Sequence, residues 1–202
     1  MDLAVFNFFY NLADKSFALD ILGIFLANYL PYLMILAAIT YILFKEDHWQ
    51  MKIFSGIFIL LSSILARSFF TRIIREFIQR PRPFETLGLE PLIRPVTEMS
   101  FPSGHASLLF GLAFAILFFN RKWGWWFIAL AFVNGLARIF TGIHWPTDII
   151  AGIAVGALSF FVIYFLLEKP YKILYKKEGE PTENEEIPEL PNLKEEKAID
   201  KE

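Results

Sequence analysis

The sequence predicts an all-α integral membrane protein, a bundle of about five transmembrane helices preceded by an N-terminal interfacial helix. Hydrophobic residues make up 55% of the 202-residue chain, its mean hydropathy is +0.46, and 23 residues are phenylalanine. These apolar residues occur in long blocks, and a helix that spans a bilayer requires roughly 20 of them in succession. Together these observations indicate one compact membrane domain rather than a soluble protein.

The individual elements follow from the lengths of the apolar blocks. Residues 3–13, LAVFNFFYNLA, are too short to span a bilayer and predict an amphipathic helix in the membrane interface. Five longer blocks predict spanning helices at about 19–44, 52–74, 104–120, 123–142 and 147–168. All five tryptophans fall at predicted helix ends, where amphipathic rings settle at the membrane–water interface. They are Trp49, Trp123, Trp125, Trp126 and Trp145.

The last part of the chain has a different composition. Residues 176–202 contain five lysines and ten acidic residues, a net charge of −5 that leaves +3 for the remainder. With its prolines and sparse apolar residues, this segment cannot bury enough surface to become ordered. We therefore expect a membrane-embedded domain at 1–175 and a disordered acidic tail at 176–202. The absence of cysteine excludes disulfides and thiolate chemistry.

Five crossings would place the loops around 75–103 and 143–146 on one face of the membrane. The loops around 45–52 and 121–122 would lie on the other face with the tail. Cations are about equally frequent on the two faces, so the positive-inside rule alone gives a tie. Several arginines on the first face are better explained by a binding site than by topology. We therefore expect a plasma-membrane protein with a cytoplasmic tail and an extracytoplasmic first face.

Three polar clusters lie at helix ends on that first face, where polar groups are expensive and usually mark function. The first is REFIQRPRP, which begins at Arg75 and ends at Pro83. Arg75 and Arg82 are seven residues apart, or two helical turns, so both can project toward a common point. The alternative is that these arginines merely extend from a helix terminus to the membrane surface.

The second cluster, SFPSGHASLLF, places polar residues at the start of an apolar helix. Ser103 can cap this helix, Gly104 allows another group to approach the backbone, and the free N–H groups of the first turn form an anion site. An ordinary helix cap would explain Pro102, Ser103 and Gly104. It would not explain His105, an ionisable group at the mouth of an apolar helix.

The third cluster, ARIFTGIHWPTD, joins the fourth and fifth predicted spans. Arg138 lies near the end of the fourth predicted helix and His144 in a tight loop. Asp148 lies in the first turn of the fifth predicted helix, and Pro146 is suited to the first position of that helix. A spacing of four residues allows the Asp148 carboxylate to accept the Nδ1–H of His144 and leave Nε2 free. The alternative is that Asp148 only complements the helix dipole.

The three clusters converge on one membrane face. They bring together two of the three histidines, three arginines and one aspartate, whereas His48 lies on the other face. Arginines combined with backbone N–H groups predict a phosphate site. Two histidines and an aspartate supply a nucleophile, a proton donor and a group that orients the nucleophile.

The clusters resemble the three signature motifs of the type 2 phosphatidic acid phosphatase family, which shares its active-site architecture with the vanadium haloperoxidases. The family's first motif is lysine, six residues, then Arg-Pro. Arg75, six residues, then Arg82 and Pro83 match it, with arginine in place of lysine. The second motif, Pro-Ser-Gly-His, is intact at residues 102–105.

The family's third motif is Ser-Arg, five residues, His, three residues, Asp. Arg138, His144 and Asp148 fit it, but Ala137 replaces the serine. This change removes a hydroxyl contact worth on the order of 1 kcal/mol. Arg75 keeps the positive charge of the family's lysine with a different geometry. Neither departure threatens the chemistry.

The resemblance implies a mechanism. His144 attacks the terminal phosphorus and becomes phosphohistidine, Asp148 fixes its tautomer, and His105 protonates the leaving oxygen and then activates water. No cofactor and no metal ion are implied, because arginines neutralise the phosphate oxygens. The phosphate-binding residues are Arg75, Arg82, Ser103, Gly104 and Arg138.

The implied partner is a lipid phosphate substrate in the membrane, and no nucleic-acid partner is expected. The compact five-helix plan most resembles the bacterial undecaprenyl-diphosphate phosphatases, while phosphatidylglycerophosphate and phosphatidate phosphatases share the same motifs. The proline-rich link at about 83–101, with Phe84, Glu85, Glu90 and Arg94, is a candidate lid over the headgroup.

Two alternatives belong to other classes. A haloperoxidase would hold vanadate in the same pocket, but that branch of the superfamily is typically large and soluble. A non-catalytic transporter or lipid-binding protein would require charges along a path through the membrane. Here the charges cluster at one end, and a complete nucleophile–acid pair would have no purpose.

Overall fold

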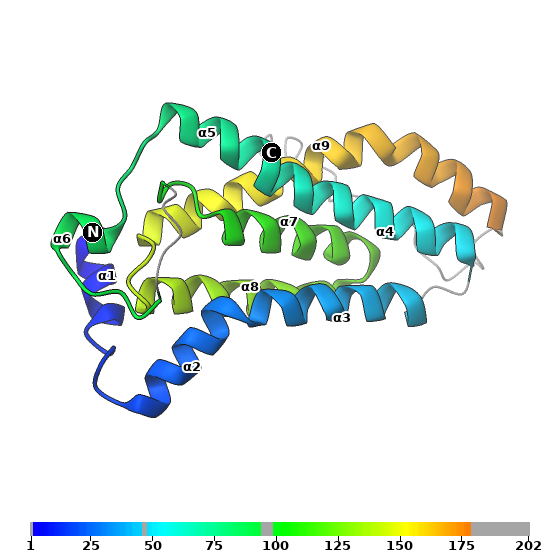
Figure 1. Ribbon diagram of the computed structural model, residues 1–202. Coiled ribbons are helices and arrows are strands. Elements are labelled where there is room, and N and C mark those ends of the chain that lie inside the picture. Colours follow the sequence, from blue (N-terminus) through cyan, green and yellow to red (C-terminus); the bar gives the residue numbers. More distant parts are fainter. Residues whose placement is uncertain (1, 46–47, 94–98, 179–202) are drawn as a thin grey trace, which may run out of the picture.

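The computed structural model describes residues 2–45, 48–93 and 99–178. All regular structure in these ranges is helical, which confirms the predicted all-α class (Figure 1). The elements are α1 (Asp2–Tyr10), α2 (Phe17–Asn28), α3 (Leu30–Lys45), α4 (Trp49–Ile64), the π-helical turn η1 (Leu65–Phe70), α5 (Thr71–Phe77), α6 (Pro83–Leu87), α7 (Gly104–Phe119), α8 (Arg121–Phe140) and α9 (Pro146–Glu178).

Three helical stretches are long and apolar enough to cross a membrane, namely Trp49–Phe77, Arg121–Phe140 and Pro146–Tyr175. Helices α2 and α3 add a fourth span if they count as one, although they are bent by 48°. The chain is therefore a multi-pass membrane protein. The predicted number of five spans is not confirmed, because α7 has only 16 residues. At 1.5 Å per residue, α7 is about 24 Å long and shorter than the hydrocarbon core.

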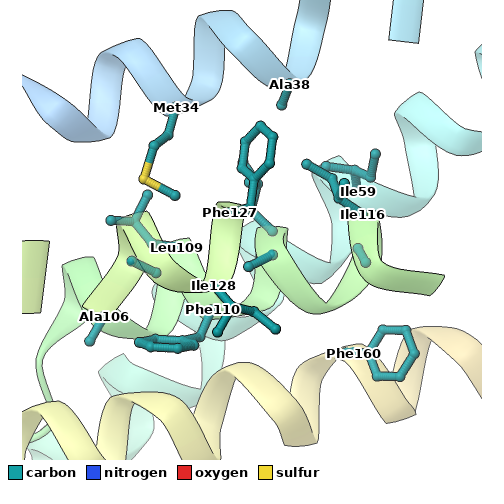
Figure 2. Packing of buried hydrophobic residues seen from close by; sticks show 14 of the residues in the cluster. Met34, Ala38, Ile59, Ala106, Leu109, Phe110, Ile116, Phe127, Ile128 and Phe160 are labelled. Carbon is teal, nitrogen blue, oxygen red and sulfur yellow. The ribbon is translucent and has the colours of Figure 1, made fainter. Parts of the chain in front are cut away.

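Helix α7 lies inside the bundle. It packs against α4, α8 and α9, and ten of its 16 residues are buried. Figure 2 shows how Leu109, Phe110 and Ile116 of α7 pack with Phe127 of α8 and Phe160 of α9. A helix that is apolar all round is suited to such a central position, where protein rather than lipid surrounds it.

Small residues allow α9 to approach α7 closely. A Cβ atom added to Gly152 would lie 2.6 Å from the Cβ of Ala106, and one added to Gly156 would lie 2.7 Å from the backbone nitrogen of Gly111. Glycine and alanine permit this kind of contact between membrane helices. The starts of the two helices are joined directly, because the Ser103 N–H donates to the Asp148 carbonyl at 3.0 Å. Two of the three predicted polar clusters therefore meet.

Helix α1 confirms the predicted N-terminal helix, although it ends at Tyr10 rather than at residue 13. It packs against α8 and α9. The fully buried Phe6 ring lies 5.4 Å from the Tyr10 ring and 5.2 Å from the Trp145 ring, measured between centroids. The location of α1 in the membrane interface stays a prediction.

The helix ends that carry the predicted polar residues lie at one end of the bundle. The end of α5, the start of α7, the end of α8 and the start of α9 lie at the same end as α1 and α6, whereas the α7–α8 connection lies at the opposite end (Figure 1). Helix α9 continues past the predicted span to Glu178. The rest of the predicted acidic tail, from residue 179 on, lies outside the described residues.

Candidate active site

A cavity of about 950 Å³ lies at this polar end of the bundle. Both histidines of the predicted site contribute to its wall, as does Gly104. Among the described lining residues, five are arginines and Glu76 is the acidic one, so the cavity is strongly cationic and suited to an anion. The arginines are Arg67, Arg72, Arg75, Arg82 and Arg138.

His144 and Asp148 form the contact expected from their spacing. The Nδ1 atom of His144 lies 3.3 Å from Oδ2 of Asp148, and both side chains are buried. Because a carboxylate can only accept, Nδ1 carries the proton in this contact and Nε2 keeps its lone pair. His144 lines the cavity and Asp148 does not, so the carboxylate lies behind the imidazole as an orienting group.

Burial controls the charge of His144, which lies in the loop between α8 and α9. Removal from water lowers the pKa of His144 to about 4, an effect that the hydrogen bond to Asp148 opposes and the cations Arg138 and Arg82 reinforce. The imidazole is therefore neutral at neutral pH, the state that a nucleophilic nitrogen requires.

Asp148 has further partners that the sequence did not predict. The Ser100 hydroxyl and the Trp145 backbone N–H donate to Oδ2, the latter at 2.8 Å. Arg80 donates from Nη1 to Oδ1 at 2.9 Å, and its guanidinium lies 5.1 Å from the centroid of the Trp145 ring. The carboxylate is therefore held on both oxygens and cannot rotate away from His144 without breaking several bonds.

Asp2 of α1 extends this network. Its carboxylate accepts from Arg80 Nη2 at 2.5 Å and from the Thr147 backbone N–H at 3.0 Å. Burial raises the pKa of Asp2, but the hydrogen bonds from Arg80 and Thr147 outweigh burial and hold that pKa below its ordinary value. Helix α1 is thus linked through one arginine to the carboxylate beside His144.

The three predicted arginines are each anchored to a backbone carbonyl. Arg75 Nη2 donates to Pro102 at 3.0 Å. Arg82 Nη1 donates to Ile143 at 2.7 Å, and Arg138 Nη1 donates to Ala27 at 3.0 Å. Each of these anchors uses one of the five N–H donors of an arginine. Arg138 also has an Nε atom with no hydrogen-bond partner among the described residues.

The start of α7 has the predicted cap. The Ser103 hydroxyl accepts from the Ala106 N–H at 3.5 Å, and Ser103 is fully buried and does not line the cavity. Gly104 and His105 do line it. A Cβ atom on Gly104 would lie 3.3 Å from Arg67 Nη1 and 3.7 Å from Arg75 Nη2, so glycine leaves room for both guanidinium groups.

The link between α5 and α7 reaches the cavity through Ile93 and Met99. It is attached to the rest of the fold by hydrogen bonds from the Leu92 N–H to the Thr141 carbonyl and from the Tyr10 hydroxyl to the Glu90 carbonyl. Arg94, part of the predicted lid, lies outside the described residues. The closing of this link over a headgroup stays a prediction.

The described residues contain no group of three or more His, Cys, Asp or Glu side chains that could hold a metal ion. The predicted independence from metal ions stays a prediction for experiment.

Two further arginines of the site, Arg67 and Arg80, were not predicted from the sequence. Arg80 lies between Arg75 and Arg82 in the segment REFIQRPRP. Arg67 interrupts the apolar block at 52–74, and an isolated charge in a spanning segment is itself a signal of function.

A membrane helix bundle with a histidine–carboxylate pair beside an arginine-lined cavity defines an integral membrane protein built to handle phosphate groups. The chain belongs to the PAP2 superfamily, whose family model matches residues 56–172 and so covers more than half of the sequence. The family expected from the three motifs is therefore confirmed.

Curated relatives extend over most of the chain. Bacitracin transport permease protein BcrC of Bacillus licheniformis is 31% identical over 171 residues, which cover 84% of this chain and 82% of that protein. Undecaprenyl-diphosphatase BcrC of Bacillus subtilis is 26% identical, with 81% and 83% covered. Lipid A 4'-phosphatase of Bacteroides thetaiotaomicron is 33% identical, with 66% and 63% covered.

Two solved structures share the fold. LpxE of Aquifex aeolicus superposes with a TM-score of 0.64 at 23% identity, covering 80% of this chain and 93% of that one. A PAP2-type phosphatidylglycerolphosphate phosphatase of Bacillus subtilis gives a TM-score of 0.59 at 22% identity, covering 83% and 85%.

Proposed function

We propose that this protein is a lipid phosphatase that removes the terminal phosphate of a lipid diphosphate, with undecaprenyl diphosphate as its substrate. The observation that carries the proposal is the His144–Asp148 pair at the wall of a cavity lined by five arginines. A neutral, oriented imidazole is a nucleophile, and a cluster of guanidinium groups is suited to the charge that develops on a phosphoryl group.

In the first step, Nε2 of His144 attacks the terminal phosphorus while the bond from phosphorus to the leaving oxygen breaks. The electron pair of that bond goes to the leaving oxygen, which His105 protonates where a proton is needed. His144 becomes phosphohistidine with a positively charged ring, and Asp148 stabilises this charge through the Nδ1–H. Arg75, Arg82 and the α7 N-terminus hold the phosphoryl oxygens.

In the second step, His105 takes a proton from a water molecule as the water oxygen attacks the phosphorus. The phosphorus–nitrogen bond breaks, its electron pair returns to Nε2, and His144 is again a neutral imidazole. Inorganic phosphate is released, and the proton gained by His105 replaces the one given to the leaving group. The cycle consumes one water molecule and needs no redox cofactor.

The choice of lipid rests on the relatives. One protein that aligns over most of its length is named an undecaprenyl-diphosphatase, and a cavity of about 950 Å³ has room for a diphosphate headgroup. The alternative substrates are phosphatidylglycerophosphate and a lipid A phosphate, for which other relatives are named, and phosphatidate, which the resemblance of the motifs implies.

A second candidate function is non-catalytic lipid-phosphate binding or transport. One relative is named a transport permease, which favours this alternative. The site argues against it, because a transporter has no use for a carboxylate that is fixed on both oxygens behind a neutral histidine.

The experiment is phosphate release by the full-length protein in lipid nanodiscs. The panel contains undecaprenyl diphosphate, undecaprenyl phosphate, phosphatidylglycerophosphate, phosphatidate and lipid A. We expect the highest kcat/KM for undecaprenyl diphosphate and no release by His144→Ala. Preference for another lipid would change the substrate assignment, and binding without release of phosphate from any lipid would favour transport.

We further propose that the active site faces the extracytoplasmic side of the plasma membrane and that the acidic end of the chain after Lys176 is cytoplasmic. Five arginines line the cavity, so they are attributed to the site and not to topology, and the cations on the opposite face then favour that face as the cytoplasmic one. A protease added outside intact cells should spare the chain after Lys176. Cleavage there without permeabilisation would invert the orientation.

A further inference from the structure

Arg67 has no role in the mechanism above, yet its position is costly. It lies inside the spanning stretch Trp49–Phe77, where a charge is tolerated only if it faces protein or a polar cavity. Its exposed side chain lines the same cavity as His105 and His144. The charge of Arg67 therefore faces any anion that enters the cavity.

The π-helical turn η1 explains how Arg67 reaches the cavity. Arg67 and Arg75 are eight residues apart, and in a regular α-helix of 3.6 residues per turn their side chains would differ in direction by about 80°. A π turn accommodates one extra residue, so the effective spacing falls to about seven, close to two full turns. The Thr71 N–H donates to the Ala66 carbonyl five residues earlier, as in a π-helix.

The result is that Arg67 and Arg75 converge on one point. Arg67 Nη1 lies 3.3 Å and Arg75 Nη2 lies 3.7 Å from the position that a Cβ atom of Gly104 would take. Whereas Arg75 is anchored to the Pro102 carbonyl, Arg67 makes no hydrogen bond or ion pair with any described residue. Its guanidinium donors are therefore available to a ligand.

The place of Arg67 in the cavity indicates which part of a ligand it would contact. Arg67 precedes Arg75 by eight residues on the helical stretch Trp49–Phe77, and this stretch ends at the polar end of the bundle, so the Cα of Arg67 lies about 12 Å farther from that end. Arg82 donates to the Ile143 carbonyl beside the nucleophile. Because the lipid chain lies in the membrane, the phosphate attached to it would lie on the Arg67 side of the terminal phosphate.

We propose that Arg67 binds the inner phosphate of a lipid diphosphate, the phosphate that stays on the lipid, and stabilises it as the leaving group. This inference rests on the proposed function. When His144 attacks the terminal phosphorus, the bridging oxygen keeps the electron pair and the inner phosphate gains one negative charge. A phosphate monoester has a second pKa of about 6, so this leaving group needs a cation more than a proton.

The test compares farnesyl diphosphate with farnesyl monophosphate, which share one lipid chain and differ by the inner phosphate. The full-length protein in nanodiscs is assayed for kcat/KM on both. We expect Arg67→Gln to lower kcat/KM by about 10- to 100-fold on the diphosphate, the fold-change that corresponds to a hydrogen bond to a charged group, and by less than about threefold on the monophosphate. Arg67→Lys should retain part of the preference.

Arg72→Gln is the matched control. Arg72 lines the same cavity from α5, but the atoms nearest to Gly104 belong to Arg67 and Arg75 and not to Arg72. This substitution should affect both substrates equally, and activity on the monophosphate shows that each variant is folded. Equal losses on both substrates in Arg67→Gln, or no loss on either, would overturn the role of Arg67. If the wild-type protein hydrolyses neither substrate, the proposed function fails as well, which is a distinguishable result.

Discussion

Arg80 forms an ion pair with Asp148 at 2.9 Å and holds the oxygen of that carboxylate that does not face His144. The two residues are 68 positions apart in the sequence, and the contact brings the end of the α5 region against the start of α9. The same guanidinium also reaches Asp2. Orientation of the nucleophile therefore depends on a chain of contacts that ends in α1.

Removal of Arg80 should weaken catalysis without removing any group that contacts phosphate. We expect Arg80→Gln to slow formation of the phosphoenzyme by about 10- to 100-fold, since a charge-assisted hydrogen bond of roughly 1.5–3 kcal/mol is lost. Asp2→Asn should have a smaller effect in the same direction. The measurement is the rate of the phenolate burst with an aryl phosphate. Arg121→Gln, an exposed cation at the start of α8, should leave that rate unchanged, and an unaltered rate in Arg80→Gln would contradict the positioning role.

Substitutions of the two histidines should differ in how strongly their effects depend on the leaving group of the substrate. An alkoxide from a lipid monophosphate needs a proton, whereas a phenolate of low pKa hardly does. We expect His105→Ala to lower the rate of hydrolysis of a lipid monophosphate by on the order of 10²–10⁴-fold. The same substitution should lower the rate of the first step with an aryl phosphate much less. His144→Ala should be inactive with both. The measurement is the single-turnover burst of phenolate in each variant. A burst that survives in His144→Ala but not in His105→Ala would reverse the two roles.

Vanadate should inhibit the enzyme, and chelators should not. A five-coordinate oxyanion attached to His144 imitates the transition state, and the arginines that line the cavity supply its counter-charges. The measurement is phosphate release with increasing orthovanadate, and separately with EDTA followed by Mg²⁺. Activity that persists at millimolar vanadate, or that is lost in EDTA and restored by Mg²⁺, would count against this site.

His144 should stay neutral in mildly acidic solution. Burial lowers its pKa to about 4, from about 6.5 in an unfolded chain. Because the unfolded chain binds this proton more readily, the contribution of His144 to stability is fully present above pH 6.5 and is lost as the pH falls toward 4. NMR of ring-labelled histidine in nanodiscs should show no titration of His144 between pH 8 and 5. Titration near 6.5 would contradict the buried, neutral nucleophile.

Local spacing made much of the site predictable. His144 and Asp148 meet because residues four apart at a helix start face each other, and Ser103 caps α7 because a serine before an apolar helix has few other roles. Both contacts lie within a few residues of sequence. Arg75 and Arg82 both line the cavity, but the predicted reason, a spacing of two helical turns, is wrong because the helix ends at Phe77.

Contacts between distant segments could not be predicted in this way. The links from Arg80 and Ser100 to Asp148, and from Asp2 to Thr147, depend on how α1 and the α5–α7 link pack against α9. Sequence periodicity carries no information about this packing. The predicted count of five spans is not confirmed, because α7, which other helices enclose, is shorter than a lipid-facing span.

The most direct test of the central claim is to trap the phosphoenzyme. His105→Ala lacks the base for the second step, so an aryl phosphate should phosphorylate it and the intermediate should accumulate. After an alkaline quench, mass spectrometry of the peptides should place one phosphate on His144, and the label should be lost in acid. Phosphate found on His105 or on a carboxylate, or a phenolate burst with no covalent phosphate on the protein, would contradict the account.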